Sequence, residues 1–189
     1  DFFKTDEYTF FPRGMYAIFS LLKWMALEGR IASDDEICIR TTIESPYISS
    51  CVTSAIEQVC KWSREINEKT KAIFVIHEFG FLHPRIKELR HIADERHIPL
   101  IEDCAYAWGS GDAGQYGDYV IYSLTKIFPL QFGGFLVGKK FEHDYMWKNF
   151  GCADTSKEGI SMQELSFHVP EFERIRESRR INYAYYQDV

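Results

Sequence analysis

The feature that most constrains the fold is a pair of apolar runs on either side of an amphipathic helix pattern. The first run, residues 72–76, has five apolar residues in a row before Gly80, which is typical of a strand buried on both faces of a parallel sheet. Residues 84–97 repeat apolar residues at helical spacing, with proline at the expected first helical position. Residues 98–103 form a second buried strand pattern. This order makes a βαβ unit, which predicts a parallel sheet with a right-handed crossover.

Strand and helix patterns continue on both sides of this unit. Residues 14–27 are rich in apolar residues after Gly14 and predict a largely buried helix. The further expected elements are a strand at residues 36–40, a helix from residue 48 to about residue 60, strands at residues 119–123 and 133–138, and a polar amphipathic helix at residues 171–186. The alternation of strands and helices predicts an α/β fold.

Charge and cysteine content exclude several classes of protein. The net charge of −6 and the lack of a basic run argue against a nucleic-acid partner. The chain has no basic start followed by an apolar segment, and no apolar run near the ~18 residues that span a bilayer. We therefore expect a soluble, cytoplasmic protein with no membrane partner. The odd number of widely spaced cysteines, with no CxxC pair, fits buried free thiols in a reducing compartment. They are Cys38, Cys51, Cys60, Cys104 and Cys152.

The histidines do not predict a metal site. The six histidines lack the spacing of helical zinc ligands, and most are expected at the surface. His77 differs because it ends a buried strand, where it could meet a substrate or satisfy a neighbouring backbone group. Cys104 follows the second strand of the βαβ unit, but the sequence places no base beside it, so we interpret it as a small buried thiol.

Several polar residues and a glycine fall where strands end or helices begin. Asp103 closes one buried strand, Ser123 and Lys126 follow the next, and Gly14 and Met15 open the first helix. Ligands of open α/β sheets collect at these positions. A buried carboxylate needs a cationic partner such as a protonated pyridine nitrogen, and a lysine in a partly dry pocket can attack an aldehyde. A helix N-terminus with a nearby hydroxyl can hold a phosphate. Together these parts predict a pyridoxal phosphate (PLP) site.

Two of these residues also have simpler interpretations when each is taken alone. Asp103 could cap a helix or a turn, and Lys126 could be a solvated lysine in a loop. Their order on successive strand ends favours the cofactor site.

At this point three segments resemble a known family, the DegT/DnrJ/EryC1/StrS aminotransferases, which are fold type I PLP enzymes. The segments are KAIFVIHEFG, IEDCAYA and GDYVIYSLTKIFPLQFGGFLVG, beside the family's VHLYG, EDAAQAHG and GD…SFxxTKN…GGM elements in the same order. The resemblance covers residues 70–138 well and residues 14–55 loosely. It implies a three-layer α/β large domain with a mostly parallel sheet at residues 1–140. Residues 141–189 would be only the beginning of a truncated C-terminal small domain.

The resemblance also assigns roles residue by residue around the cofactor ring. Lys126 aligns with the lysine that forms the Schiff base with PLP, and Asp103 with the carboxylate that pairs with the pyridine nitrogen. Ala105 would pack beneath the ring. Tyr106 falls where the family usually has Gln or His near the ring oxygen, in a DxAY form similar to aspartate-type aminotransferases. Ser123 lies three residues before the lysine, as in those enzymes.

The remaining assignments concern the phosphate and the ring face. Gly14 and Met15 align with a Gly followed by Thr or Arg that binds phosphate through the backbone. Tyr47 is the candidate for the aromatic that stacks on the ring, although a plain packing role fits it equally well. The family usually has another strand and loop before residue 71, whereas only KWSREINEKT follows Cys60 here.

The activity implied by the resemblance is that of a PLP-dependent aminotransferase. Lys126 would hold PLP and shuttle a proton, with an amino acid such as glutamate as donor and a keto-sugar attached to a nucleotide as acceptor. The fold also implies a homodimer. The alternative is a catalytically silent or regulatory protein that keeps the fold but lacks a complete small domain.

Overall fold

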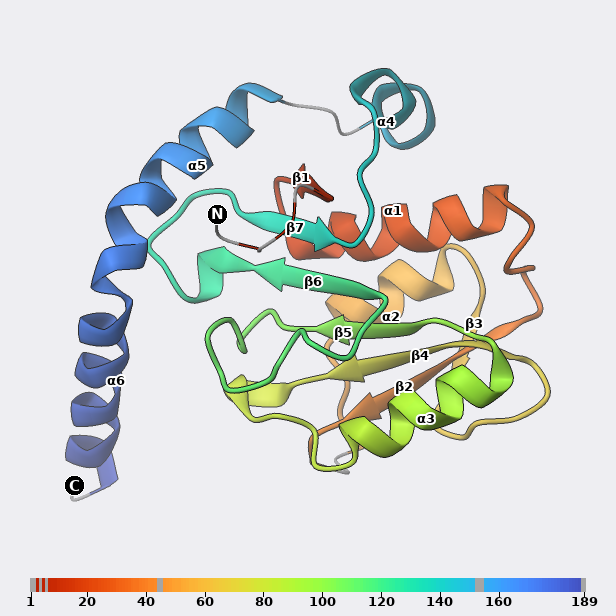
Figure 1. The fold of residues 1–189 in the computed structure, drawn as a ribbon, viewed down its shortest axis with the longest axis horizontal. Coiled ribbons are helices and arrows are strands. Elements are labelled where there is room, and N and C mark those ends of the chain that lie inside the picture. Colours follow the sequence, from red (N-terminus) through yellow and green to blue (C-terminus); the bar gives the residue numbers. More distant parts are fainter. Residues whose placement is uncertain (1–2, 4, 6, 44–45, 152–154, 188–189) are drawn as a thin grey trace.

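A computed structural model describes residues 3, 5, 7–43, 46–151 and 155–187, and its core is a mixed seven-stranded sheet (Figure 1). The strand order is β1-β7-β6-β5-β4-β2-β3. β7 pairs antiparallel with β1 and with β6, and the other strand pairs are parallel. The strands are β1 (Tyr8–Phe11), β2 (Glu36–Thr41), β3 (Lys61–Ser63), β4 (Thr70–Ile76), β5 (Leu100–Asp103), β6 (Tyr119–Ser123) and β7 (Gly134–Val137). The mostly parallel α/β sheet expected from the sequence is confirmed.

The central strand β4 shows why the sheet is covered on both faces. Successive side chains of a strand point to opposite faces, and those of residues 72–75 are all buried. Ala72 and Phe74 belong to the core formed with α1 (Gly14–Leu27) and α2 (Ser50–Glu57). Ile73 and Val75 belong to the core formed with α3 (Ile86–Arg96) on the other face. The result is three layers, with α1 and α2 on one face and α3 on the other (Figure 1).

The register of the parallel strands brings three strand ends together. Ile76 pairs with Asp103 across β4 and β5, and Asp103 pairs with Ile121 across β5 and β6. Two residues further along β6, Ser123 ends that strand, and the short helix η2 (Leu124–Lys126) follows it directly. The predicted site residues at the ends of these strands therefore lie at the same edge of the sheet.

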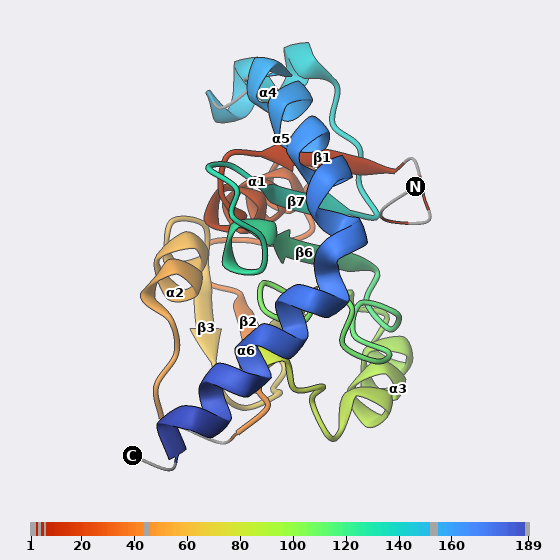
Figure 2. The same cartoon turned by 90° about the vertical axis from the view of Figure 1, so that its left-hand side faces the viewer.

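The C-terminal part of the chain is helical. Its elements are α4 (His143–Phe150), α5 (Thr155–His168), η3 (Val169–Glu171) and α6 (Phe172–Gln187). In α5, Leu165 is fully buried in a second core cluster with Phe10, Phe128 and Phe135. The helix α6 crosses in front of the sheet at the edge where β4, β5 and β6 end (Figure 2), and its Phe172 ring lies 4.9 Å from that of Trp108.

The structure corrects several expectations about element bounds. The strands β1 and β3 were not predicted. β3 is a short strand at the start of the segment KWSREINEKT. The helix expected from residue 48 to about residue 60 is shorter, as α2 shows. Pro84 does not occupy the first helical position: Arg85 is the N-cap of α3 and the Ile86 N–H bonds back to the His83 carbonyl. Residues 83–86 thus form a turn before the helix.

The cysteine prediction is partly wrong. Cys38, Cys60 and Cys104 are buried free thiols as expected, whereas Cys51 is exposed, because it lies in the first turn of α2 and lines a cavity instead of the core. Cys152 lies outside the described residues. Among the described helices, none combines the length and apolarity required to cross a bilayer.

Candidate functional site

A cavity of about 480 Å³ opens at the edge where β4, β5 and β6 end, beside the N-termini of α1 and α2. All of the residues proposed from the sequence line it, although they come from segments far apart in the chain. They are Gly14, Met15, Tyr47, Asp103, Ala105, Tyr106, Ser123 and Lys126. The structure therefore brings the whole predicted set to one place.

The N-terminus of α1 reaches the cavity because glycines permit close packing there. A Cβ added at Gly14 would lie 3.1 Å from the Cβ of Ser123, and one added at Gly134 would lie 2.3 Å from the carbonyl carbon of Arg13. Arg13 is the N-cap, and no side chain caps the helix. The first N–H groups of a helix have no partner within the helix. The start of α1 thus offers N–H donors to an anion.

Asp103 is a buried carboxylate at the cavity wall. Its side chain accepts a 2.9 Å hydrogen bond from the Ala105 N–H at Oδ1, so its interpretation as a turn cap is partly right. The residue is 7% exposed. Burial raises the pKa of Asp103, against the lowering effects of the Ala105 N–H and of the charges on Lys126 and His77. A cation placed against this carboxylate would stabilise its ionised form.

Lys126 and Tyr106 are in contact with each other at the cavity. Lys126 ends η2, and its Nζ lies 4.3 Å from the centroid of the Tyr106 ring. An ammonium group over an aromatic face is attracted by the ring's negative charge density. Ser123, at the end of β6, is buried, and its Oγ lies 3.4 Å from Oγ1 of Thr125. Lys126 is exposed to solvent on the cavity side, as its interpretation as a loop lysine also required.

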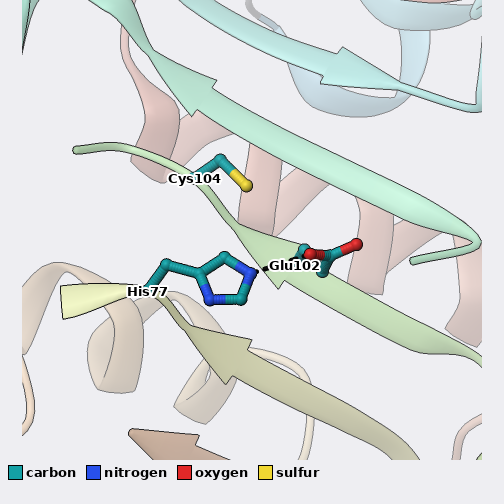
Figure 3. Close-up of side chains that lie close together, drawn as sticks. All are labelled: His77, Glu102 and Cys104. Atoms are coloured by element: carbon teal, nitrogen blue, oxygen red, sulfur yellow. Dashed lines mark hydrogen bonds and ion pairs between the residues drawn. The ribbon is translucent and has the colours of Figure 1, made fainter. Parts of the chain in front are cut away.

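His77 lines the cavity, but its ring is held in a buried polar pair with Glu102 (Figure 3). Nε2 of His77 lies 2.7 Å from Oε2 of Glu102, and both side chains are fully buried. The His83 N–H donates to Nδ1 of His77 at 3.1 Å, which leaves the ring proton on Nε2, where it is donated to Glu102. Of the two alternatives for His77, the structure favours contact with protein groups.

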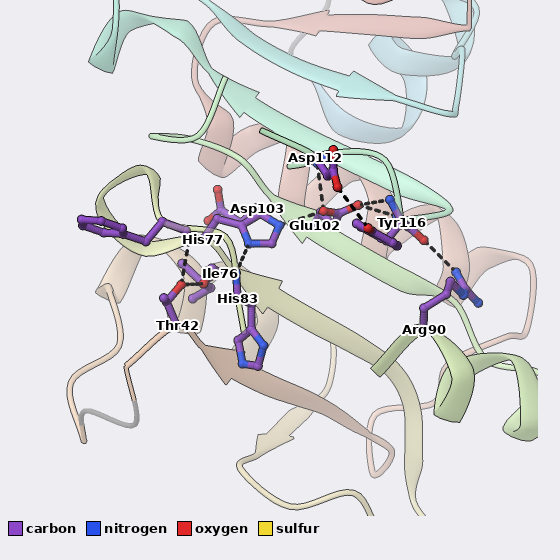
Figure 4. Close-up of polar contacts among 12 residues, drawn as sticks. Thr42, Ile76, His77, His83, Arg90, Glu102, Asp103, Asp112 and Tyr116 are labelled. Carbon is purple, nitrogen blue, oxygen red and sulfur yellow. Dashed lines mark hydrogen bonds and ion pairs between the residues drawn. The ribbon is translucent and has the colours of Figure 1, made fainter. Parts of the chain in front are cut away.

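Glu102 also fixes the glycine-rich loop that follows β5. Its carboxylate accepts the N–H of Gly114 at 2.9 Å, of Tyr116 at 2.7 Å, and of Gly117 (Figure 4). Burial alone raises the pKa of Glu102, but the hydrogen bonds from His77, Gly114 and Gly117 outweigh it and lower that pKa. The loop that begins at Ala105 is thus held against β5 by hydrogen bonds to the Glu102 side chain.

The cluster of His77, Glu102 and Cys104 has the spacing of metal ligands but not the right chemistry. The ligand atoms lie within 4.8 Å of one another. However, hydrogen-bond donors already surround the Glu102 carboxylate, and burial raises the pKa of the Cys104 thiol well above its usual range. A metal requires the deprotonated thiolate. The cluster is better described as a hydrogen-bonded support for the site.

Some residues of the site were not predicted from the sequence. Arg179 of α6 donates from Nη2 to the carbonyl oxygens of Ile127, at 2.7 Å, and Lys126, at 3.4 Å. Phe79 and Arg13 line the cavity. The glycine pair at residues 133–134 and the HEFG segment were the available signals for Gly134 and Phe79, whereas nothing in the sequence indicates Arg179.

Comparison with known proteins identifies the family. The model of the DegT/DnrJ/EryC1/StrS aminotransferase family matches residues 52–163, which is more than half of the chain. The chain belongs to this family. The match includes β4, β5 and β6, and with them Asp103 and Lys126.

Relatives of the family share the sequence and the fold at moderate similarity. GDP-perosamine synthase of Vibrio cholerae is 30% identical over 113 residues, covering 46% of this chain and 30% of its own length. L-glutamine:scyllo-inosose aminotransferase of Streptomyces griseus is 27% identical over 122 residues, covering 61% of this chain and 27% of its own. The chain thus spans less than a third of these relatives.

Solved structures confirm the fold type expected for the chain. Helicobacter pylori PseC, an aminotransferase involved in the biosynthesis of pseudoaminic acid, superposes with a TM-score of 0.59 at 16% identity, over 74% of this chain and 42% of PseC. NtdA of Bacillus subtilis, solved with bound cofactor PMP, gives a TM-score of 0.55 at 20% identity, over 71% of this chain and 33% of NtdA. The predicted fold type I architecture is confirmed.

Proposed function

We propose that the protein is a PLP-dependent aminotransferase whose cofactor occupies the cavity at the ends of β4, β5 and β6. The observation that carries the proposal is that a buried carboxylate, Asp103, and an amine, Lys126, reach one cavity from neighbouring strand ends. The cavity volume of about 480 Å³ falls within the ~300–1,000 Å³ of small-molecule and cofactor sites. The residues present therefore fit PLP.

Asp103 is the group that would orient and charge the cofactor ring. Its carboxylate is buried and its pKa is raised, so a protonated pyridine nitrogen beside it would relieve the cost of burying a charge. When bound, PLP supplies an electron-withdrawing ring that stabilises a carbanion at the substrate carbon. Ala105, in the same turn, would support one face of the ring.

Lys126 is the proposed catalytic residue. Its Nζ would bind the cofactor's aldehyde carbon with loss of water and, once a donor amine displaces it, would move a proton as general acid and base. The Tyr106 ring lies 4.3 Å from Nζ and packs against the lysine amine. Tyr106 would also be the residue nearest the ring oxygen.

The phosphate would lie at the start of α1. Gly14 and Met15 line the cavity at a helix N-terminus without a capping side chain, and Ser123 packs directly against Gly14. Such a helix end binds anions through its N–H groups and its dipole. Tyr47 lies at the cavity, 72% exposed, where it would stack on the ring.

The substrates follow from the relatives. We propose an amino acid such as glutamate as the donor and a keto-sugar attached to a nucleotide, or a similar carbonyl compound, as the acceptor. The name GDP-perosamine synthase supports a sugar attached to a nucleotide, and the name L-glutamine:scyllo-inosose aminotransferase supports an amino acid as donor. We further propose a cytoplasmic homodimer, with residues 1–140 as the large domain and residues 141–189 as part of the small domain.

The test is the absorbance of the protein with PLP. We expect a yellow protein whose band shifts to shorter wavelength when glutamate is added, and a Lys126→Ala variant without the original band. A colourless protein that ignores added PLP would overturn the proposal in favour of a catalytically silent protein. If the protein with PLP shows the band but glutamate leaves it unchanged, the proposal of transamination is wrong and only the proposal of cofactor binding remains.

A further inference from the structure

Phe79 holds an unfavourable backbone conformation at the cavity. Its φ is 54° and its ψ is 21°, in the left-handed region, where a side chain with a Cβ costs free energy. Among the described non-glycine residues, His97 shares this property, and there it ends α3 as a left-handed cap. Phe79 ends no long helix, so helix capping does not explain its conformation.

Contacts from neighbouring segments hold the turn at residues 78–81. Oγ1 of Thr42 accepts the Glu78 N–H at 3.0 Å and lies within hydrogen-bonding distance of the carbonyl oxygens of Ile76 and Phe81 (Figure 4). The Ile43 N–H donates to Oε2 of Glu78 at 2.8 Å. Strain persists only where the surrounding structure determines it. These contacts therefore hold the backbone of the turn and fix the position of Phe79.

The Phe79 side chain is presented to the cavity instead of the core. It is 72% exposed and lines the cavity. Its ring centroid lies 6.3 Å from that of Tyr106, whose ring in turn lies 4.3 Å from Nζ of Lys126. The Phe79 ring is thus separated from the proposed reacting amine by one ring, that of Tyr106.

We propose that Phe79 is a specificity-determining residue that packs against the apolar C–H face of a ring-shaped carbonyl acceptor. Cyclic sugars and cyclitols carry such a face, and it gains dispersion and hydrophobic contact on a phenyl ring. An open-chain 2-oxo acid has no rigid face of this size. The inference rests on the proposed aminotransferase function and adds which acceptors the site prefers and the residue that selects them.

The experiment uses the PLP-bound protein and its variants Phe79→Ala, Phe79→Tyr and Phe81→Ala. Phe81 is a matched control because it is also an exposed phenylalanine, at 69%, but does not line the cavity. Glutamate first converts each protein to the amino form, and recovery of the original band is then followed with scyllo-inosose, a cyclic ketone, or with 2-oxoglutarate, an open-chain one.

We expect Phe79→Ala to raise the KM for scyllo-inosose roughly tenfold, the effect of losing one good contact, and to change the KM for 2-oxoglutarate less than about twofold. Phe79→Tyr and Phe81→Ala should stay close to the parent protein. Recovery with 2-oxoglutarate but not with scyllo-inosose in the parent protein would overturn the inference. Equal effects of Phe79→Ala on both acceptors, or equal effects of Phe79→Ala and Phe81→Ala, would also overturn it.

A second measurement tests the backbone strain at Phe79 without requiring the enzyme reaction. Because glycine adopts the left-handed region freely, Phe79→Gly should raise the melting temperature of the cofactor-free protein by about 2–4 °C, whereas Phe81→Gly should not. A lower melting temperature for Phe79→Gly would show that Phe79 stabilises the fold, and would contradict a role kept for substrate selection. Failure of the proposed function appears earlier, as a band that glutamate does not shift.

Discussion

At the scale of single residues, the site is built from charged groups that cost stability. Asp103 is the clearest case. Burial raises its pKa because the Ala105 N–H and more distant charges do not compensate for lost hydration. Glu102, one residue earlier, is the opposite case, because its hydrogen bonds lower its pKa. The pKa values of these two neighbouring carboxyl groups are thus shifted in opposite directions. The Glu102 carboxylate is hydrogen-bonded within the protein, whereas Asp103 lines the cavity.

Replacing Asp103 with Asn should stabilise the cofactor-free protein and weaken cofactor binding. A raised folded-state pKa means that stability is highest below the unfolded-state pKa and falls as the pH rises through the folded-state value. In the Asp103→Asn variant the stability should no longer fall with pH in this way. Its free energy of unfolding at pH 7 should exceed that of the parent by about 1–2 kcal/mol. Urea denaturation at pH 4 and pH 7 measures the first effect, and PLP titration the second.

Exposed Asp34 provides the matched control for this substitution. Asp34→Asn should change neither stability nor PLP binding. An Asp103→Asn variant that is less stable than the parent at pH 7, or that binds PLP equally well, would contradict the assignment of Asp103.

Glu102 predicts the opposite pH dependence. Its pKa is lowered from the ordinary value of 4.5, so its contribution to stability is present above that value and is lost as the pH falls through the lower folded-state pKa. Glu102→Gln places an amide NH₂ where several N–H donors converge, and should cost about 2–4 kcal/mol. Chemical denaturation as a function of pH measures this. Exposed Glu68→Gln should be nearly neutral, and equal effects of the two substitutions would argue against the network.

At the scale of elements, the site depends on how closely the start of α1 approaches β6 and β7. Gly14 packs on Ser123, and Gly134 leaves no room for a Cβ beside the Arg13 backbone. Helix and strand ends can meet at this distance only without side chains between them. The small residues of this contact therefore place the N–H groups of α1 at the cavity.

Gly134→Ala should separate α1 from β7. The added methyl group would overlap backbone atoms, so we expect a loss of about 1–3 kcal/mol in the free energy of unfolding and weaker binding of PLP. Gly159→Ala is the control, since Gly159 lies in α5 and a Cβ added there would point into open space, so that alanine should stabilise by about 0.5–1 kcal/mol. Similar results for both variants, from denaturant titration, would contradict the packing argument.

Element by element, the sequence predicted what depends on local pattern and missed what depends on tertiary contact. The buried runs of β4 and β5 and the apolar stripe of α3 were visible because burial on both faces, or on one helical face, leaves a periodic trace. The edge strands β1 and β3 have four and three residues. Each is defined by pairing with a neighbouring strand.

The same division holds for the site. Asp103 and Lys126 could be predicted because ligand sites lie at the carboxyl ends of parallel strands, and the family resemblance added Ala105 and Tyr106. The left-handed conformation of Phe79 and the reach of Arg179 across η2 depend on segments that meet only in three dimensions. No local pattern of residues carries that information.

At the scale of the whole molecule, the helix α5 is attached to the sheet through a buried contact region. Leu165 is fully buried among residues of β1 and β7, whereas Ile160 in the same helix is 54% exposed. Leu165→Ala should cost about 2–5 kcal/mol, and Ile160→Ala no more than about 0.5 kcal/mol. Thermal unfolding followed by circular dichroism measures both. A Leu165→Ala variant that loses only the C-terminal helices, in a separate transition, would show that they do not unfold together with the sheet.

The central claim is that Lys126 carries the cofactor, and chemical trapping tests it most directly. Borohydride reduces the bond between a lysine and PLP to a stable amine, so the labelled residue can be found by mass spectrometry of peptides. We predict that the protein incubated with PLP and reduced carries the label at Lys126, and that Lys126→Arg carries none. Label at other lysines only, or a Lys126→Arg variant labelled as fully as the parent protein, would contradict the account.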